Sequence, residues 1–141
     1  DAVSDIFRRP SLFLNYLPLS HIVSWSNAMT VPKKLLWKES GKALSLKEYI
    51  KHTFSEDIVN PRNKNIEIKN LSRDEILTSV KECWRFLTNS IEFEQEDRDI
   101  QDKFWEIIKS EPKSQDFHDW IHPKARVGLS WIKSKDKNFL L

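Results

Sequence analysis

Short apolar runs dominate the first half of the chain, whereas helical periodicity dominates the second half. Ser11–Leu19 is an apolar run bounded by prolines, which predicts a buried strand. Ala2–Arg9, before it, has the pattern of the end of a helix that Pro10 stops. Ser20–Lys34 shows no clean period and is predicted to be a loop. Three further segments complete this half: a brief apolar element at Leu35–Trp37, an irregular stretch at Phe54–Lys64 and a strand at Asn65–Lys69.

Four helices are predicted after residue 44, and two of them begin at capping boxes. Ser45 and Glu48 open a short helix that runs to about His52, and Ser72 and Glu75 open a longer one. A third helix is predicted at about Glu96–Lys109 and a fourth at about Pro123–Ser134. The inner faces of the last three helices are predicted to be Ile76, Leu77, Val80, Cys83, Trp84 and Leu87; Ile100, Phe104, Ile107 and Ile108; and Ala125, Gly128, Leu129 and Ile132.

This order of elements predicts a helix-rich α/β fold with few strands followed by three C-terminal helices. The 141 residues suit a single domain. A helix end followed at once by a strand, with no methionine at the start, predicts that the domain is partial and that the chain is the C-terminal piece of a longer protein. Residues 1–70 would be the strand-and-loop part and residues 71–141 the helical part.

Composition excludes several classes of site. With only two glycines, Gly41 and Gly128, the chain has no Gly-rich dinucleotide loop, P-loop or nucleophile elbow. The net charge is +2 with both signs interspersed, so there is no basic stripe for nucleic acid. Cys83 is the only cysteine, which indicates a reducing compartment and a buried thiol. No apolar run is long enough to span a membrane.

Blocks along almost the whole chain, in the same order, resemble a family of bacterial glycosyltransferases encoded in regions for surface-carbohydrate biosynthesis. The blocks are FRRPSLFLNYLPL (residues 7–19), VPKKLLW (31–37), ALSLKEYI (43–50), IEIKNLSRDEI (66–76), EQEDRDIQDKFWEI (94–107) and ARVGLSWIKSKDKNFL (125–140). The resemblance implies the last part of the C-terminal half of a Rossmann-like, GT-B-type enzyme. The phosphate-facing loop of such a half would precede Asp1.

The same resemblance implies a function in bacterial surface polysaccharide biosynthesis. The full-length protein would take a nucleotide-sugar donor and a glycan acceptor, with no cofactor and no metal, in the cytoplasm, with or without attachment to the inner membrane face. The isolated chain would be inactive without the missing N-terminal part. No sequence motif in the chain identifies a catalytic residue. The alternative function is that of a non-catalytic helical interaction domain. It is suggested by the three amphipathic helices after Ser72 and by the lack of a complete active-site motif in the sequence.

Candidate binding residues cluster in the loop after the first strand. Ligands of open α/β sheets bind beyond the carboxyl ends of the strands, and the loop after Pro18 is expected to face that crevice. Hydroxyl and amide groups suit sugar hydroxyls, and an indole face suits a sugar or base ring. A purely structural role, in which these residues cap turns and pin the loop to the scaffold, is the commoner alternative. The candidates are His21, Ser24, Trp25, Ser26 and Asn27.

Two other groups of residues are candidates for sites. Lys33, beside Lys34, could neutralise a diphosphate, although a solvated lysine pair is the commoner outcome. His118, Asp119 and His122 have partly metal-like spacing, but Pro123 disfavours the helix that would bring them together. Trp84, Trp105 and Trp131 are predicted to pack helices in the core.

Overall fold

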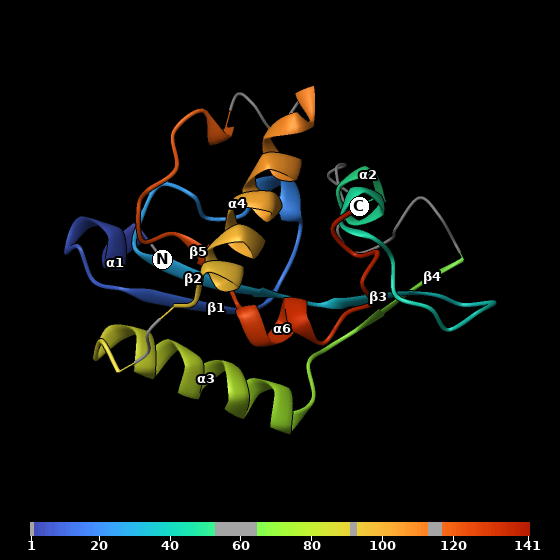
Figure 1. Cartoon of the computed structure of the whole chain (residues 1–141), viewed down its shortest axis with the longest axis horizontal. Coiled ribbons are helices and arrows are strands. Elements are labelled where there is room, and N and C mark those ends of the chain that lie inside the picture. Colours follow the sequence, from blue (N-terminus) through green and yellow to red (C-terminus); the bar gives the residue numbers. More distant parts are fainter. Residues whose placement is uncertain (1, 53–64, 91–92, 113–116) are drawn as a thin grey trace.

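The computed structural model describes residues 2–52, 65–90, 93–112 and 117–141 and shows a mixed α/β chain (Figure 1). The α/β class predicted from the sequence is therefore confirmed, whereas the irregular stretch predicted at Phe54–Lys64 lies outside the described residues. The elements are α1 (Ala2–Ile6), β1 (Ser11–Tyr16), the 3-10 turn η1 (Leu19–His21), β2 (Ala28–Pro32), β3 (Lys34–Trp37), α2 (Leu46–His52), β4 (Ile66–Lys69), α3 (Arg73–Leu87), α4 (Gln95–Ser110), β5 (Arg126–Val127) and α6 (Leu129–Lys133).

Three parallel strands form the central sheet in the order β1-β2-β5. β1 pairs with β2 from Ser11 opposite Ala28 onward, and β2 pairs with β5 at Thr30 opposite Val127. The strand predicted from Ser11 is thus confirmed, although it ends at Tyr16. The predicted loop at Ser20–Lys34 is wrong over β2, the middle strand. All five residues of β2 are buried, so it lacks the polar–apolar alternation of a half-exposed strand.

A second, antiparallel pair of strands continues directly from β2. β3 pairs with β4 from Lys34 opposite Lys69 to Trp37 opposite Ile66, as the two short predicted elements suggested. The capping box that begins α2 is also confirmed. The Ser45 Oγ accepts a hydrogen bond from the Glu48 N–H at 3.4 Å, and Glu48 Oε2 accepts one from the Ser45 N–H at 2.8 Å.

α3 begins as predicted but faces the core with a different side. Its Ser72–Glu75 capping box is present, yet the predicted core residue Trp84 is 67% exposed. Leu77, Val80 and Leu87 are also exposed. The inward side carries the buried Ser79 and Cys83 and the half-buried Glu82. The prediction is confirmed for Cys83 and for Ile76, which packs against the core. Periodicity missed Ser79 and Glu82 because they are polar and are satisfied by specific partners.

Glu82 is one of those partners, since it joins α3 to α6. Its carboxylate accepts hydrogen bonds from the backbone N–H groups of Leu129 and Ser130, at 2.7 and 3.0 Å. These are the free donors of the first turn of α6, where a negative charge is favourable. The contact holds Glu82 inward and thereby turns Trp84 toward solvent.

α4 agrees with its prediction, because Phe104, Ile107 and Ile108 are buried and Ile100 packs against the core. Trp105 and Trp131, at 7% and 4% exposure, are core residues as predicted.

The helix predicted at Pro123–Ser134 is wrong in its first half, where the chain forms β5. Arg126 and Val127 pair with β2 on one side. On the other side the Gln101 amide donates to the Val127 carbonyl at 2.8 Å and accepts from its N–H at 3.1 Å. Backbone groups paired on both sides outweigh the local helical pattern. α6 then begins after Gly128, where a Cβ would lie 3.0 Å from Val31 Cγ2.

None of the helices in the described ranges combines the length and the apolar character needed to cross a bilayer.

Candidate functional site

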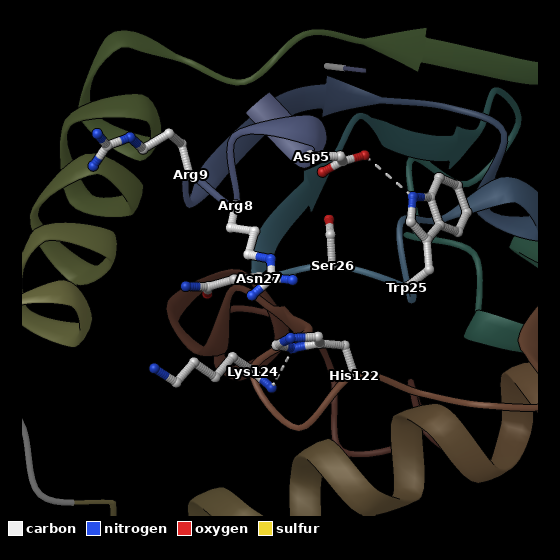
Figure 2. A pocket seen from close by; sticks show the side chains of 8 residues that line it. All are labelled: Asp5, Arg8, Arg9, Trp25, Ser26, Asn27, His122 and Lys124. Carbon is white, nitrogen blue, oxygen red and sulfur yellow. Dashed lines mark hydrogen bonds between the residues drawn. The ribbon is translucent and has the colours of Figure 1, made fainter. Parts of the chain in front are cut away.

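A pocket of about 480 Å³ lies at the edge of the central sheet where its three parallel strands begin (Figure 2). That volume is within the range of small-molecule sites. Each strand is preceded by part of the lining. The residues are Asp5, Arg8 and Arg9 before β1, Trp25, Ser26 and Asn27 before β2, and His122 and Lys124 before β5.

The position of this pocket corrects one expectation about the loop between β1 and β2. The loop leaves the carboxyl end of β1 at Pro18, but parallel pairing requires it to return to the opposite edge before β2. The Ser11 N–H donates to the Asn27 carbonyl at 3.0 Å at that edge. Trp25, Ser26 and Asn27 therefore lie at the amino ends of the strands and do not face the carboxyl-end crevice.

Arg8 reaches the pocket from a helix terminus in a left-handed conformation. The Arg9 N–H donates to the Ser4 carbonyl at 2.8 Å and the Arg8 N–H to the Asp5 carbonyl at 3.0 Å, which is the Schellman pattern that ends a helix. Arg8 has a φ of 51° at the position where glycine is usual. Figure 2 shows its guanidinium turned over Ser26 and Asn27, whereas Arg9 points away from them.

Trp25 is oriented by α1. Its indole Nε1–H donates to Oδ2 of Asp5 at 3.2 Å, and the residue remains 49% exposed. Beside it, the Ser26 hydroxyl is buried and has no hydrogen-bond partner among the described residues. The pocket thus offers an indole held by its edge and the amide of Asn27.

His122 enters the site from the segment before β5. Its backbone N–H donates to the Ser24 carbonyl at 2.7 Å, and its Nδ1 accepts from the Lys124 N–H at 3.0 Å. In the neutral ring the remaining nitrogen, Nε2, therefore carries the proton. His122 can donate a hydrogen bond to a ligand through that atom.

The charge of the lining favours an anion. Arg8, Arg9 and Lys124 are cationic, and Asp5 is the one carboxylate. Asp5 is engaged by the Trp25 indole, and none of the three cations forms an ion pair with a described residue. A guanidinium fork binds carboxylate or phosphate in a bidentate manner.

Ser24, another predicted site residue, is fully buried and has a structural partner. The His118 Nε2 donates to the Ser20 carbonyl at 2.8 Å, so its Nδ1 accepts from the Ser24 hydroxyl at 2.7 Å. Both side chains are 0% exposed. Burial lowers the pKa of His118, which favours the neutral ring that this arrangement needs. No ligand can reach the Ser24–His118 pair without movement of the fold.

His21 and Lys33 also lie outside the pocket. The ring of His21 is exposed and lies 5.0 Å from that of Phe117. Lys33 follows β2 at the carboxyl edge of the sheet, where its carbonyl accepts from the Tyr49 hydroxyl at 3.2 Å.

A second hollow, of about 240 Å³, lies nearer that carboxyl edge, between β2, α3 and α6. Its lining includes Asp74 and Glu75. Partial burial tends to raise the pKa of Glu75, but hydrogen bonds from Lys34 and Ser72 lower it to about 2, so the carboxylate is ionised. Two carboxylates disfavour an anionic ligand in this hollow. The first pocket is therefore the better site for an anion.

Within the described ranges, no three or more His, Cys, Asp or Glu residues are grouped so that they could hold a metal ion. Of the residues with partly metal-like spacing, His118 is buried and hydrogen-bonded to Ser20 and Ser24, while Asp119 is exposed.

Comparisons of the chain with protein-family models, curated proteins and solved structures found no match.

The amino acid pattern predicted three residues of this pocket and missed five. Trp25, Ser26 and Asn27 stood out because they form one polar and aromatic segment. The missed residues are Asp5, Arg8, Arg9, His122 and Lys124, which come from the two ends of the sequence and meet only because β1, β2 and β5 are parallel neighbours. The Arg8-Arg9-Pro10 sequence after a helix was the one local signal available.

Proposed function

We propose that this chain is part of a glycosyltransferase, and that its pocket at the amino ends of β1, β2 and β5 binds the phosphate and the sugar ring of an activated sugar. The observation that carries this proposal is the placement of the Arg8 guanidinium and the Trp25 indole on one pocket (Figure 2). A cation and an aromatic face side by side match a ligand that joins an anionic group to a ring.

The individual groups suit the two halves of such a ligand. Arg8 and the Nε2–H of His122 can donate hydrogen bonds to phosphate oxygens, and Lys124 adds a positive charge. The exposed face of Trp25 can stack on a sugar ring, while the amide of Asn27 can hydrogen-bond its hydroxyls.

The resemblance described above supports the assignment to a longer glycosyltransferase, whereas the choice of this pocket rests on its own residues, because open α/β sheets usually bind ligands beyond the carboxyl ends of their strands. The reaction would be attack of an acceptor hydroxyl on the anomeric carbon, with the nucleoside diphosphate leaving with the bonding electrons. The described residues bind and orient in this proposal, and the base that takes the acceptor proton belongs to another part of the protein. A cytoplasmic location, a nucleotide-sugar donor, a glycan acceptor and a Rossmann-like architecture are all parts of this proposal.

The proposal is tested by titration calorimetry of the chain with glucose 1-phosphate, uridine diphosphate glucose and glucose. We expect the two phosphorylated compounds to bind and glucose to bind much more weakly. Arg8→Gln should weaken binding of glucose 1-phosphate about tenfold or more, because a charge-assisted contact is lost. Arg98→Gln, which removes an exposed arginine from α4, is the matched control and should leave binding unchanged.

Two results would reject this assignment. One is the absence of binding by either phosphorylated compound, and the other is an equal loss of affinity in the Arg8→Gln and Arg98→Gln variants. Binding that Arg8→Gln leaves intact would place the ligand elsewhere on the chain.

A further inference from the structure

The outer face of α3 combines exposed apolar side chains with basic ones. Leu77, Val80, Trp84 and Leu87, here called the α3 stripe, recur at intervals of three or four residues and are 49%, 44%, 67% and 41% exposed. Such spacing places them along one side of the helix. In Figure 1, α3 is the outermost helix on its side of the central sheet, and the exposed fractions show that the rest of the described chain leaves the stripe uncovered.

Basic residues border the α3 stripe. Lys81 and Arg85, one turn apart, adjoin the stripe beside Leu77 and Trp84, and Arg73 lies at its amino-terminal end. All three are exposed, and none forms a salt bridge within the described part of the chain.

The carboxylates of α3, by contrast, are mostly turned inward. Glu75 forms an ion pair with Lys34 at 2.8 Å, and Glu82 caps α6. Asp74 is the one acidic residue among the exposed positions of α3. Three cations and one carboxylate give the outer side a formal charge of +2, beside an apolar stripe.

We propose that this face of α3 docks on a bilayer that contains anionic phospholipids. The charge selects the occupant: an interfacial helix buries its apolar residues at the level of the headgroups while lysine and arginine contact anionic lipid. Tryptophan favours that same depth because its ring is amphipathic. A helix of 15 residues is about 22 Å long and would lie flat on the surface. This inference does not depend on the ligand of the pocket.

Sedimentation with lipid vesicles tests it on the full chain. We expect little binding to vesicles of phosphatidylcholine and clear, salt-sensitive binding when phosphatidylglycerol is added. Lys81→Glu combined with Arg85→Glu should reduce that binding at least about tenfold. Lys47→Glu combined with Lys51→Glu makes the same charge change at the same spacing on α2, and should reduce it much less.

Tryptophan fluorescence locates the contact. Vesicles with bromine on their acyl chains should quench part of the emission of the wild type, and Trp84→Phe should remove most of that quenching. Trp120→Phe replaces a comparably exposed tryptophan, 60% against 67%, and should retain it. Because Trp84 is exposed, its replacement should leave the melting temperature nearly unchanged.

The proposal is overturned if phosphatidylglycerol does not increase binding, or if the α2 and α3 charge variants lose binding equally. It is also overturned if the chain dimerises through this face, which would appear as a dimer in sedimentation velocity that Trp84→Ala dissociates, without binding to vesicles.

Discussion

The indole Nε1–H of Trp25 donates a hydrogen bond of 3.2 Å to Oδ2 of Asp5, and so joins the loop before β2 to the helix before β1. The bond fixes the edge of the indole and leaves its face open to the pocket, where Trp25 is 49% exposed. A residue from α1 thereby orients the aromatic surface to which we assign the sugar ring.

Asp5→Ala should weaken ligand binding more than it weakens the fold. The lost hydrogen bond is exposed, so the free energy of unfolding should fall by less than about 1 kcal/mol. The indole would then rotate, and we expect a several-fold lower affinity for glucose 1-phosphate in calorimetry. A large fall in stability with unchanged affinity would show that the bond serves the fold alone.

Arg8→Gly should change stability and binding in opposite directions. Arg8 holds a φ of 51° at the end of α1, and glycine adopts that conformation without the steric cost of a Cβ. The variant should therefore be more stable by about 0.5–1 kcal/mol in urea unfolding. It should also bind glucose 1-phosphate less tightly, because the guanidinium is gone.

An arginine where glycine is the more stable choice is typical of a site that sacrifices stability for function. If Arg8→Gly bound glucose 1-phosphate as well as the wild type, the guanidinium would have no part in binding.

The buried His118 should make the protein less stable in mild acid. Burial lowers its pKa below the ordinary 6.5, so the unfolded chain binds a proton at a pH where the folded protein does not. The stabilisation is complete above about pH 6.5 and is lost as the pH falls from there toward the lowered pKa, by up to about 1.4 kcal/mol per pH unit.

Urea unfolding at about pH 7.5 and at about pH 5.5 measures this effect. His118→Gln keeps an amide that can hydrogen-bond within the site but cannot gain the proton. It should be less stable than the wild type at the higher pH and lose less stability on acidification. Equal losses in both proteins would exclude His118 as the cause.

Gln101 should be required for the stability of β5, the edge strand of the central sheet. Its amide satisfies both backbone groups of Val127, which is 0% exposed. Gln101→Ala leaves a buried N–H and a buried carbonyl without partners and should cost about 2 kcal/mol or more. Gln101→Glu keeps an acceptor for the N–H but loses the donor to the carbonyl, so it should also destabilise the protein. A change below about 0.5 kcal/mol for both variants in urea unfolding would contradict this role.

Local patterns in the sequence were sufficient to predict the elements whose stabilising contacts lie within a few residues of one another. The capping boxes at Ser45 and Ser72 and the apolar face of α4 depend on neighbours within a few residues, and all are present. β2 and β5 depend on pairing between distant segments. β5 is two residues long, and no local signal distinguishes it from the start of a helix.

The side of α3 that faces the core could not be predicted for a related reason. Periodicity placed Trp84 inside, whereas the structure buries Ser79, whose hydroxyl donates to the Glu75 carbonyl, and turns the half-buried Glu82 toward the first turn of α6. A hydrophobic pattern does not anticipate either partner, and the contact of Glu82 with α6 is also distant in sequence. Local sequence reasoning likewise identified Trp25 as a site residue but not Arg8, because Arg8 reaches the pocket from another segment of the chain.

The most direct test of the binding site is the indole signal of Trp25 in a ¹H–¹⁵N NMR spectrum of the chain. Trp25→Phe assigns this signal by its disappearance. We predict that glucose 1-phosphate shifts it progressively to saturation, together with the backbone amide of Asn27, and that Arg8→Gln weakens the response. An indole signal of Trp25 that stays unchanged, while signals at the carboxyl edge such as Lys33 shift, would contradict the account and place the ligand at the opposite end of the sheet.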